Sequence, residues 1–143
     1  MIRFAFTLAT GIAFAFPALA AVDIQEVTSP GGIKAWLVEE HSIPFTALEI
    51  RFKGGASLDA EGKRGAINLM SGLLDEGAGD LDSRAFSAAR ENLAASIRFN
   101  ASDDAVSVSA RFLTENRAQA VDLIRMAVTE PRFDEDAIDR VRG

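Results

Sequence analysis

Residues 66–79, AINLMSGLLDEGAG, combine the spacing of a helix-borne site with side chains of little reactivity. The pattern predicts one amphipathic helix that ends at a glycine. On that helix Asn68, Ser71 and Gly72 stand at i, i+3 and i+4 and share one face. A neutral amide is a poor metal ligand, an unassisted hydroxyl has no basicity near neutral pH, and glycine has no side chain. This face therefore predicts neither a metal site nor a general base.

Metal-ligating side chains are scarce in the rest of the chain. Its 143 residues include no Cys, and the only His is His41. Disulfides and thiolate metal sites are therefore excluded, and a zinc site built mainly from imidazoles is impossible within this chain. His41 lies in a turn just before Pro44, so we interpret it as an ordinary surface histidine.

The charge balance argues against a nucleic-acid partner. The chain has 15 basic and 21 acidic side chains, for a net charge of -6. Binding to phosphate backbones requires clustered Lys and Arg, which this composition does not favour. The length is that of a single domain.

Residues 1–20 have the features of a secretory signal peptide. Arg3 gives a basic start, residues 4–16 form an apolar run too short to span a bilayer, and Pro17 precedes the small residues ALA. We expect cleavage after Ala20, which leaves residues 21–143 as a mature periplasmic domain with no membrane attachment. An uncleaved membrane anchor is the alternative. A bacterial periplasm suits an exported chain without disulfides.

Alternating apolar residues predict three strands before the first helix. They cover VDIQEV at 22–27, IKAWLVEE at 33–40 and FTALEIRFK at 45–53, with turns at 29–32 and 41–44. The third is the clearest, because its apolar residues alternate with charged ones along its second half. A Gly-rich loop at 54–65 then leads to the helix that carries Asn68.

The second half of the sequence predicts a helix, a hairpin and two further helices. Ser83 is a plausible N-cap for a helix at 84–94, and residues 96–102 and 105–112 read as a hairpin. Thr114 and Asp134 are plausible caps of the last two helices. The first of these ends before Pro131 and has an apolar stripe at helical spacing, made of Ala120, Leu123, Ile124, Ala127 and Val128.

The predicted fold class is α+β, with a largely antiparallel sheet packed with helices in the order βββααββαα. The final stretch, DAIDRVRG, ends before its apolar face has a partner. We therefore expect residues 21–143 to be an incomplete domain at the front of a longer protein.

Two features near the end of the first helix allow two interpretations each. Glycine inside a helix costs about 1 kcal/mol relative to alanine, so Gly72 indicates close packing by a neighbouring element. An open cleft wall is the alternative. Asp75 and Glu76 fall in the predicted last turn, which is unfavourable for carboxylates. We interpret them as a solvated helix end, with substrate or divalent-cation binding as the alternative.

Four stretches, in order, resemble the N-terminal domain of the pitrilysin/insulinase-type zinc metallopeptidases. They are IPFTALEIRFKGGASLD, GAINLMSGLLDEGAG, NLAASIRFNASDDAVSVSARFL and AVDLIRMAVTEPRFDEDAID. The resemblance implies that the helix after the Gly-rich loop carries H-x-x-E-H in catalytic members. There the two His bind zinc, the Glu activates zinc-bound water, and a distant Glu completes the site.

Matching Gly65 and Gly77 to the family's glycines places Asn68 at the first His, Ser71 at the Glu and Gly72 at the second His. The resemblance thus implies a degenerate zinc motif, with no cofactor in this chain and no catalysis by it alone. The residues Asn100 and Ala101 match the strand on which catalytic relatives hold an extended peptide. A purely structural strand is the alternative.

Three functions are compatible with this resemblance. The first is an exported non-catalytic subunit that pairs with a homologous zinc-bearing chain, shares its peptide substrate and acts in peptide or protein turnover. The second is a structural or scaffolding subunit of the same superfamily. The third is an active zinc metalloendopeptidase, which is the weakest because one His cannot supply two His ligands.

Overall fold

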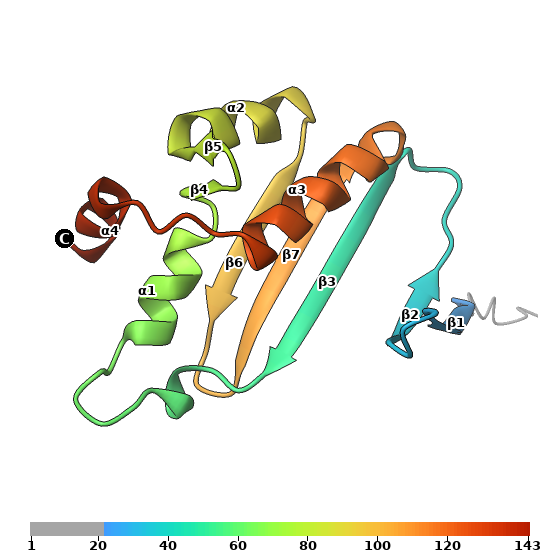
Figure 1. The fold of residues 1–143 in the computed structure, drawn as a ribbon. Coiled ribbons are helices and arrows are strands. Elements are labelled where there is room, and N and C mark those ends of the chain that lie inside the picture. The colour runs from blue at the N-terminus through green and yellow to red at the C-terminus, as the bar shows by residue number, and fades with distance from the viewer. Residues whose placement is uncertain (1–21) are drawn as a thin grey trace, which may run out of the picture. The chain divides into compact units, whose positions relative to one another are not determined.

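The computed structural model describes residues 22–143 (Figure 1). The predicted signal peptide and its cleavage site after Ala20 lie outside the described residues. The chain divides at His41 into two compact units, and each is described by itself. Among the described residues, none of the helices is both long and apolar enough to cross a bilayer.

The first unit contains an antiparallel hairpin. Strand β1 (Ile24–Thr28) pairs with β2 (Lys34–Val38), which confirms the first two predicted strands and the turn between them. The Ser29 amide donates to the carbonyl of Ile33 at 2.8 Å, and Lys34 Nζ lies 2.7 Å from Glu26 Oε1. Every residue of both strands is exposed, including Trp36.

The second unit is built on a three-stranded antiparallel sheet. Strand β7 (Ala105–Leu113) lies between β3 (Phe45–Lys53) and β6 (Ser96–Ala101). The register sets Ile50 opposite Val108, and Val108 opposite Phe99, so apolar side chains from all three strands share a face. The strand predicted at 45–53 and the hairpin predicted after residue 95 are confirmed.

The predicted element order is confirmed with one addition. A short hairpin of β4 (Gly77–Ala78) and β5 (Leu81–Asp82) follows the first helix. The α+β class with antiparallel sheets is confirmed.

The first helix, α1 (Ala66–Leu73), is shorter than predicted. The chain leaves the helical path because the backbone at 77–79 pairs with residues far along the sequence. The Gly79 amide donates to the Glu130 carbonyl at 2.9 Å, and the Arg132 amide donates to the Gly77 carbonyl at 3.1 Å. Gly77 has a φ of 134°, which glycine alone adopts without strain.

The remaining helices are α2 (Ser83–Asn92), α3 (Arg117–Thr129) and α4 (Glu135–Arg142). Short 3-10 turns at Ala56–Leu58 and Thr114–Asn116 precede α1 and α3. The predicted caps were partly wrong. Asp82, not Ser83, caps α2 by accepting from the Ala85 amide at 2.8 Å. Thr114 opens a 3-10 turn instead, and Asp134 occupies the N-cap of α4 without a side-chain capping bond.

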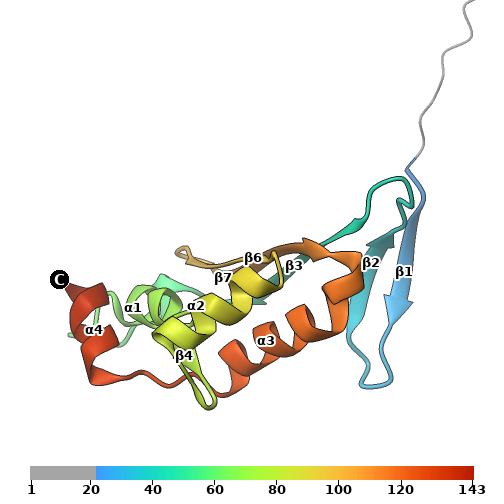
Figure 2. The same ribbon diagram turned by 90° about the horizontal axis from the view of Figure 1, so that it is seen from above.

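One apolar core joins the sheet to two helices. Figure 2 shows α2 and α3 on the same side of the three strands. Phe86 of α2 is fully buried, and the predicted stripe of α3 is confirmed, with Val128 partly buried at its edge. The buried residues of this core are Ala78, Phe86, Ile97, Val108, Ala110, Phe112, Ala120, Leu123, Ile124 and Ala127.

The Gly-rich loop is held against the turn of the β6–β7 hairpin. A Cβ at Gly55 would lie 1.9 Å from the carbonyl oxygen of Ser102 and 2.7 Å from the amide nitrogen of Ala105. The Ala56 amide donates to the same Ser102 carbonyl at 2.8 Å. Glycine at position 55 therefore permits the backbone contact that places the loop, and with it the start of α1.

Candidate functional site

The start of α1 is fixed by a carboxylate from the loop before it. Gly65, the N-cap residue, has no side chain to cap the helix. Instead Asp59 accepts from the Gly65 amide at 2.6 Å through Oδ2 and from the Ile67 amide at 3.0 Å through Oδ1. A carboxylate at a helix N-terminus also interacts favourably with the helix dipole. This contact satisfies two backbone amides at the start of α1, which carries the motif positions.

The helix α1 lies beside β6 and contacts α4 (Figure 1). The motif positions Asn68, Ser71 and Gly72 all belong to it, as the spacing predicted. They differ in exposure: Asn68 is exposed, Gly72 is partly buried, and only 3% of Ser71 is exposed. The Ser71 hydroxyl has no hydrogen-bond partner within the described residues. The three positions thus form no shared polar site.

Gly72 makes room for α4. A Cβ at this position would lie 3.1 Å from Val141 Cγ1, tighter than most real contacts of this kind. The close packing predicted for Gly72 is confirmed, and the open cleft wall is not observed. An apolar side chain therefore occupies the space beside the position matched to the second His.

The donors on α1 do not fit the zinc ion of the resembling peptidases. Zinc sites in proteins use imidazole, thiolate and carboxylate ligands, and α1 offers an amide, a hydroxyl and a glycine at the matched positions. Across residues 22–143 no group of three or more His, Cys, Asp or Glu side chains is placed to hold a metal ion. His41, which is exposed, lies 3.3 Å from a carboxylate oxygen of Glu39.

Asp75 and Glu76 lie beyond the end of α1, so their assignment to its last turn was wrong. Neither is a solvated helix end. Glu76 Oε2 accepts from Arg140 of α4 at 2.5 Å and from the Ser83 hydroxyl of α2 at 2.8 Å. Asp75 Oδ2 lies 3.4 Å from Arg90 of α2. These contacts connect the end of α1 to two later helices.

The environment shifts the pKa values of these two carboxyl groups in opposite directions. The hydrogen bond from Arg140 lowers the pKa of Glu76, with a further contribution from Ser83. Burial raises the pKa of Asp75, and the positive charge of Arg90 only partly offsets that effect. Ionised Glu76 therefore stabilises the fold, whereas ionisation of Asp75 destabilises it.

A pair of neutral variants should separate these effects. Ionised Glu76 stabilises the fold above its unfolded pKa, and this stability is lost as the pH falls through its lowered pKa in the folded state. Glu76→Gln should therefore reduce the urea midpoint near neutral pH. The difference from wild type should shrink as the pH falls through the lowered pKa of Glu76. Asp75→Asn should instead raise the midpoint near neutral pH, since the raised folded pKa marks an unfavourable charge. Urea titrations across pH test both, and equal shifts in one direction would contradict the assignment.

The proposed peptide strand is an edge strand. Asn100 and Ala101 lie near the end of β6, opposite Ser107 and Val106 of β7. On its other side β6 pairs with no strand in the part of the chain that the structure describes. Asn100 is exposed and Ala101 partly buried. The backbone of β6 therefore has the position that strand addition requires, next to α1.

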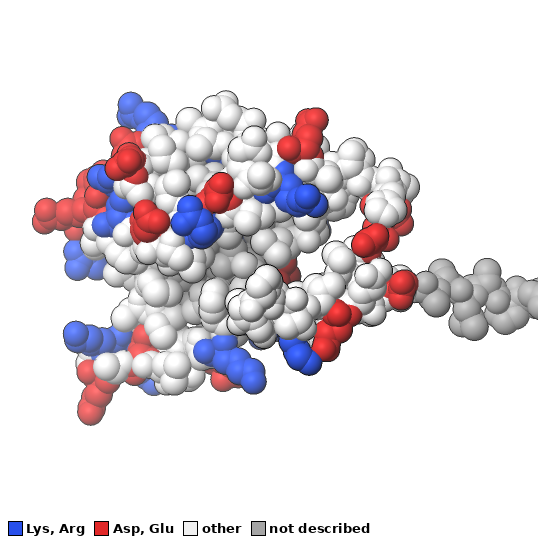
Figure 3. All heavy atoms as spheres, turned by 45° about the vertical axis from the view of Figure 1, so that its right-hand side comes forward, with Lys and Arg blue, Asp and Glu red and all other residues white. Residues whose placement is uncertain are grey.

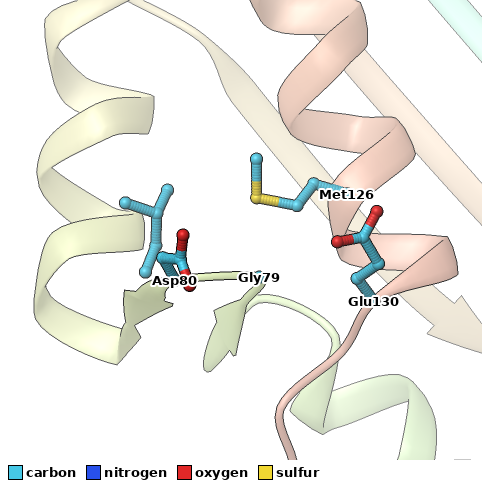
Figure 4. A pocket seen from close by; sticks show the side chains of 5 residues that line it. Gly79, Asp80, Met126 and Glu130 are labelled. Carbon is cyan, nitrogen blue, oxygen red and sulfur yellow. The ribbon is translucent and has the colours of Figure 1, made fainter.

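A hollow that the sequence did not predict lies elsewhere, between the β4–β5 turn and α3. Figure 4 shows Met126 beside it, with the carboxylates of Asp80 and Glu130 at its rim. Its volume is about 320 Å³. One oxygen of Glu130 lies 3.7 Å from Arg125, and the other lining residues are Gly79 and Leu81. The lining residues come from two distant stretches, 79–81 and 126–130, so no local sequence pattern could predict this hollow.

The surface charge is mixed on the face that Figure 3 presents. Basic and acidic side chains alternate there without a continuous positive patch. Among the described residues, Arg132 lies 2.8 Å from Asp134 and Arg142 lies 2.9 Å from Asp139. This distribution agrees with the net charge and gives no support to phosphate binding on that face.

Comparison with known proteins supports the resemblance found in the sequence. Residues 34–143 match the family model described as insulinase (peptidase family M16). The non-peptidase homologue YmxG of Helicobacter pylori is 25% identical over 142 residues, which are 99% of this chain and 32% of that protein.

Solved structures share the fold. A peptidase M16 inactive domain from Pseudomonas fluorescens is 28% identical, with a TM-score of 0.78 over 85% of this chain and 30% of that one. A protease from Helicobacter pylori and pitrilysin, each 16% identical, give TM-scores of 0.71 and 0.72 over 85% and 87% of this chain. They are matched over 29% and 13% of their own lengths.

The chain thus spans about a third of the length of the Helicobacter pylori homologue and of the Pseudomonas fluorescens structure. The family match covers β2, the three-stranded sheet and every helix described above. It also includes α1, the helix that carries Asn68, Ser71 and Gly72. On this evidence the chain belongs to the insulinase family, peptidase family M16.

Proposed function

We propose that this protein is an exported, non-catalytic partner subunit of an M16-type zinc peptidase. One observation carries the proposal: the helix that matches the zinc-binding helix holds an exposed Asn68, a buried Ser71 and a Gly72 packed against Val141. None of these can bind zinc or activate water. Relatives named as a non-peptidase homologue and an inactive domain support the same interpretation.

A partner that has lost its own site can still contribute to a shared one. The edge of β6, with Asn100 and Ala101, offers backbone amide and carbonyl groups that strand addition uses without particular side chains. The fold around that edge is intact, because the β3–β7–β6 sheet keeps its apolar core. We infer that zinc and catalysis belong to a homologous chain with an intact motif, and that both chains share the peptide substrate.

Reconstitution tests the proposal. The full-length protein and a homologous zinc-bearing chain are assayed separately and together with a fluorogenic peptide, and zinc is measured in each sample. We expect zinc in the partner alone and strong activity only in the mixture. Zinc at one equivalent in this protein, with chelator-sensitive hydrolysis by it alone, would overturn the proposal. A stable complex without activity would favour the scaffolding function instead.

Variants of the mixture assign roles to the two chains. Asn68→Ala in this protein should leave activity within about twofold of wild type, because an exposed amide on α1 has no catalytic task. Replacing the Glu of the partner's H-x-x-E-H should abolish activity. A large loss from Asn68→Ala with an unchanged complex would show that α1 takes part in catalysis after all.

Export is the second part of the proposal. The basic start, apolar run and ALA segment of residues 1–20 predict removal by signal peptidase. Mass spectrometry of the protein recovered from a Gram-negative periplasm should give Ala21 as the first residue. Intact protein in the membrane fraction would instead support the uncleaved anchor.

A further inference from the structure

The β3–β7–β6 sheet has a second face, which carries no apolar core. Alternation along the strands places most apolar side chains toward α2 and α3 and most polar ones on the other face. In Figure 2 this face points away from both helices. Its residues are Phe45, Ala47, Glu49, Arg51 and Lys53 of β3, Ala105, Ser107, Ser109, Arg111 and Leu113 of β7, and Ser96, Arg98 and Asn100 of β6. We call it the open sheet face.

The open sheet face is positively charged, although the chain as a whole carries a net charge of -6. Arg51, Arg98 and Arg111 are exposed, and within residues 22–143 none of them forms an ion pair. The one acidic residue of this face is Glu49, which accepts a hydrogen bond from Ser109. Most described arginines of α3 and α4, in contrast, lie beside a carboxylate.

The spacing of two of these arginines suits a particular ligand. Arg98 stands opposite Ser109 and Arg111 opposite Ser96, so the two arginines occupy diagonal positions on neighbouring strands. Such positions are about 7–8 Å apart. Alternate residues of an extended chain lie about 7 Å apart. Both arginines border a hollow of about 530 Å³, together with Ser96, Ser109 and Glu49. Carboxylates at alternate positions of an extended segment would therefore meet both guanidinium groups.

We propose that the open sheet face docks an acidic, extended segment of a partner protein, with Asp or Glu at alternate positions pairing with Arg98 and Arg111. Arginine suits this role, because its planar guanidinium binds carboxylates through two hydrogen bonds and is always charged. The hydroxyl of Ser96, opposite Arg111, can donate a hydrogen bond to the same carboxylates. This interaction lies on a different face of the sheet from its apolar core and does not depend on the proposed peptidase partnership.

A peptide-binding measurement tests the proposal on the full chain. The probe is a fluorescein-labelled peptide of alternating Glu and Ser, and the control peptide has Gln in place of Glu. Fluorescence anisotropy should show binding of the first peptide only, weakening as salt is raised to roughly 0.5 M. Arg98→Gln and Arg111→Gln should each weaken it by roughly threefold, and the double variant by roughly tenfold.

The matched control is Arg84→Gln with Arg117→Gln. These arginines are also exposed and form no ion pair within residues 22–143, but they belong to α2 and α3. The control should bind the acidic peptide as the wild type does. Equal losses in both double variants would overturn the proposal, as would no binding by the wild type. Stronger binding of a poly-dT oligonucleotide, or a dimer that the Arg98/Arg111 variant disrupts, would reassign the face to nucleic acid or to a second copy.

Discussion

Replacing Phe86 by alanine is expected to destabilise the 42–143 unit by about 3–5 kcal/mol, the range for phenylalanines deleted from tightly packed cores. The Phe86 side chain is fully buried between α2 and the sheet, in the cluster that contains Val108 and Ile124. Truncation would remove its apolar contacts and leave a cavity that rigid neighbours cannot fill. Urea unfolding followed by far-UV circular dichroism measures the change. Tryptophan fluorescence would not serve, because Trp36 is exposed on the β1–β2 hairpin.

Phe45→Ala is the matched control for Phe86→Ala. The same atoms are removed, but Phe45 is 45% exposed at the start of β3. We expect a loss well below that of Phe86→Ala, because less apolar surface returns to water. Similar losses for both variants would contradict the assignment of the core to the α2 and α3 side of the sheet. A loss in Phe86→Ala below about 1 kcal/mol would do so as well.

Elements with a strong local period were predictable from the sequence. Strand β3 begins and ends at the predicted residues, because Leu48 and Ile50 alternate with charged residues. The β6–β7 hairpin and the buried stripe of α3 were also predicted, since a half-buried strand or helix repeats its apolar residues at its own period. Each signal lies within a single stretch of chain.

Features set by distant residues were not predictable in this way. The pattern of residues 66–79 favours a longer helix, but the carbonyl of Glu130 and the amide of Arg132 engage the backbone of 77–79 instead. Asp134 stands at a helix start, yet its carboxylate accepts from Arg132 at 2.8 Å. In both cases a tertiary contact outweighs a local preference of about 1 kcal/mol.

The same distinction, between local patterns and contacts of distant residues, applies to the candidate site. Residue types alone showed that Asn68, Ser71 and Gly72 lack zinc chemistry. The packing of Val141 against Gly72 and the pairing of Glu76 with Arg140 required the fold, because Arg140 lies 64 residues after Glu76. The arginines of the open sheet face required the register of β6 on β7, which no single strand reveals.

Introducing a histidine at position 72 is expected to disturb α4 before the imidazole can help to bind zinc. The first side-chain atom of Gly72→His would already lie 3.1 Å from Val141 Cγ1, and the imidazole adds further bulk in the same direction. Overpacking of this kind costs about 1–3 kcal/mol. Asn68→His, on an exposed position of α1, should change stability by at most about 0.5 kcal/mol. Urea unfolding of each single variant measures the difference.

A second substitution shows whether Val141 is the cause. In Gly72→His/Val141→Ala the clash is removed, so the double variant should be more stable than the sum of the two single losses predicts. The variant Asn68→His/Ser71→Glu/Gly72→His should bind zinc more weakly than the same variant with Val141→Ala, because the imidazole at 72 then has room beside α4. Competition with a chromophoric chelator measures both affinities. Additive losses, together with equal zinc affinities, would show that α4 does not close the motif face.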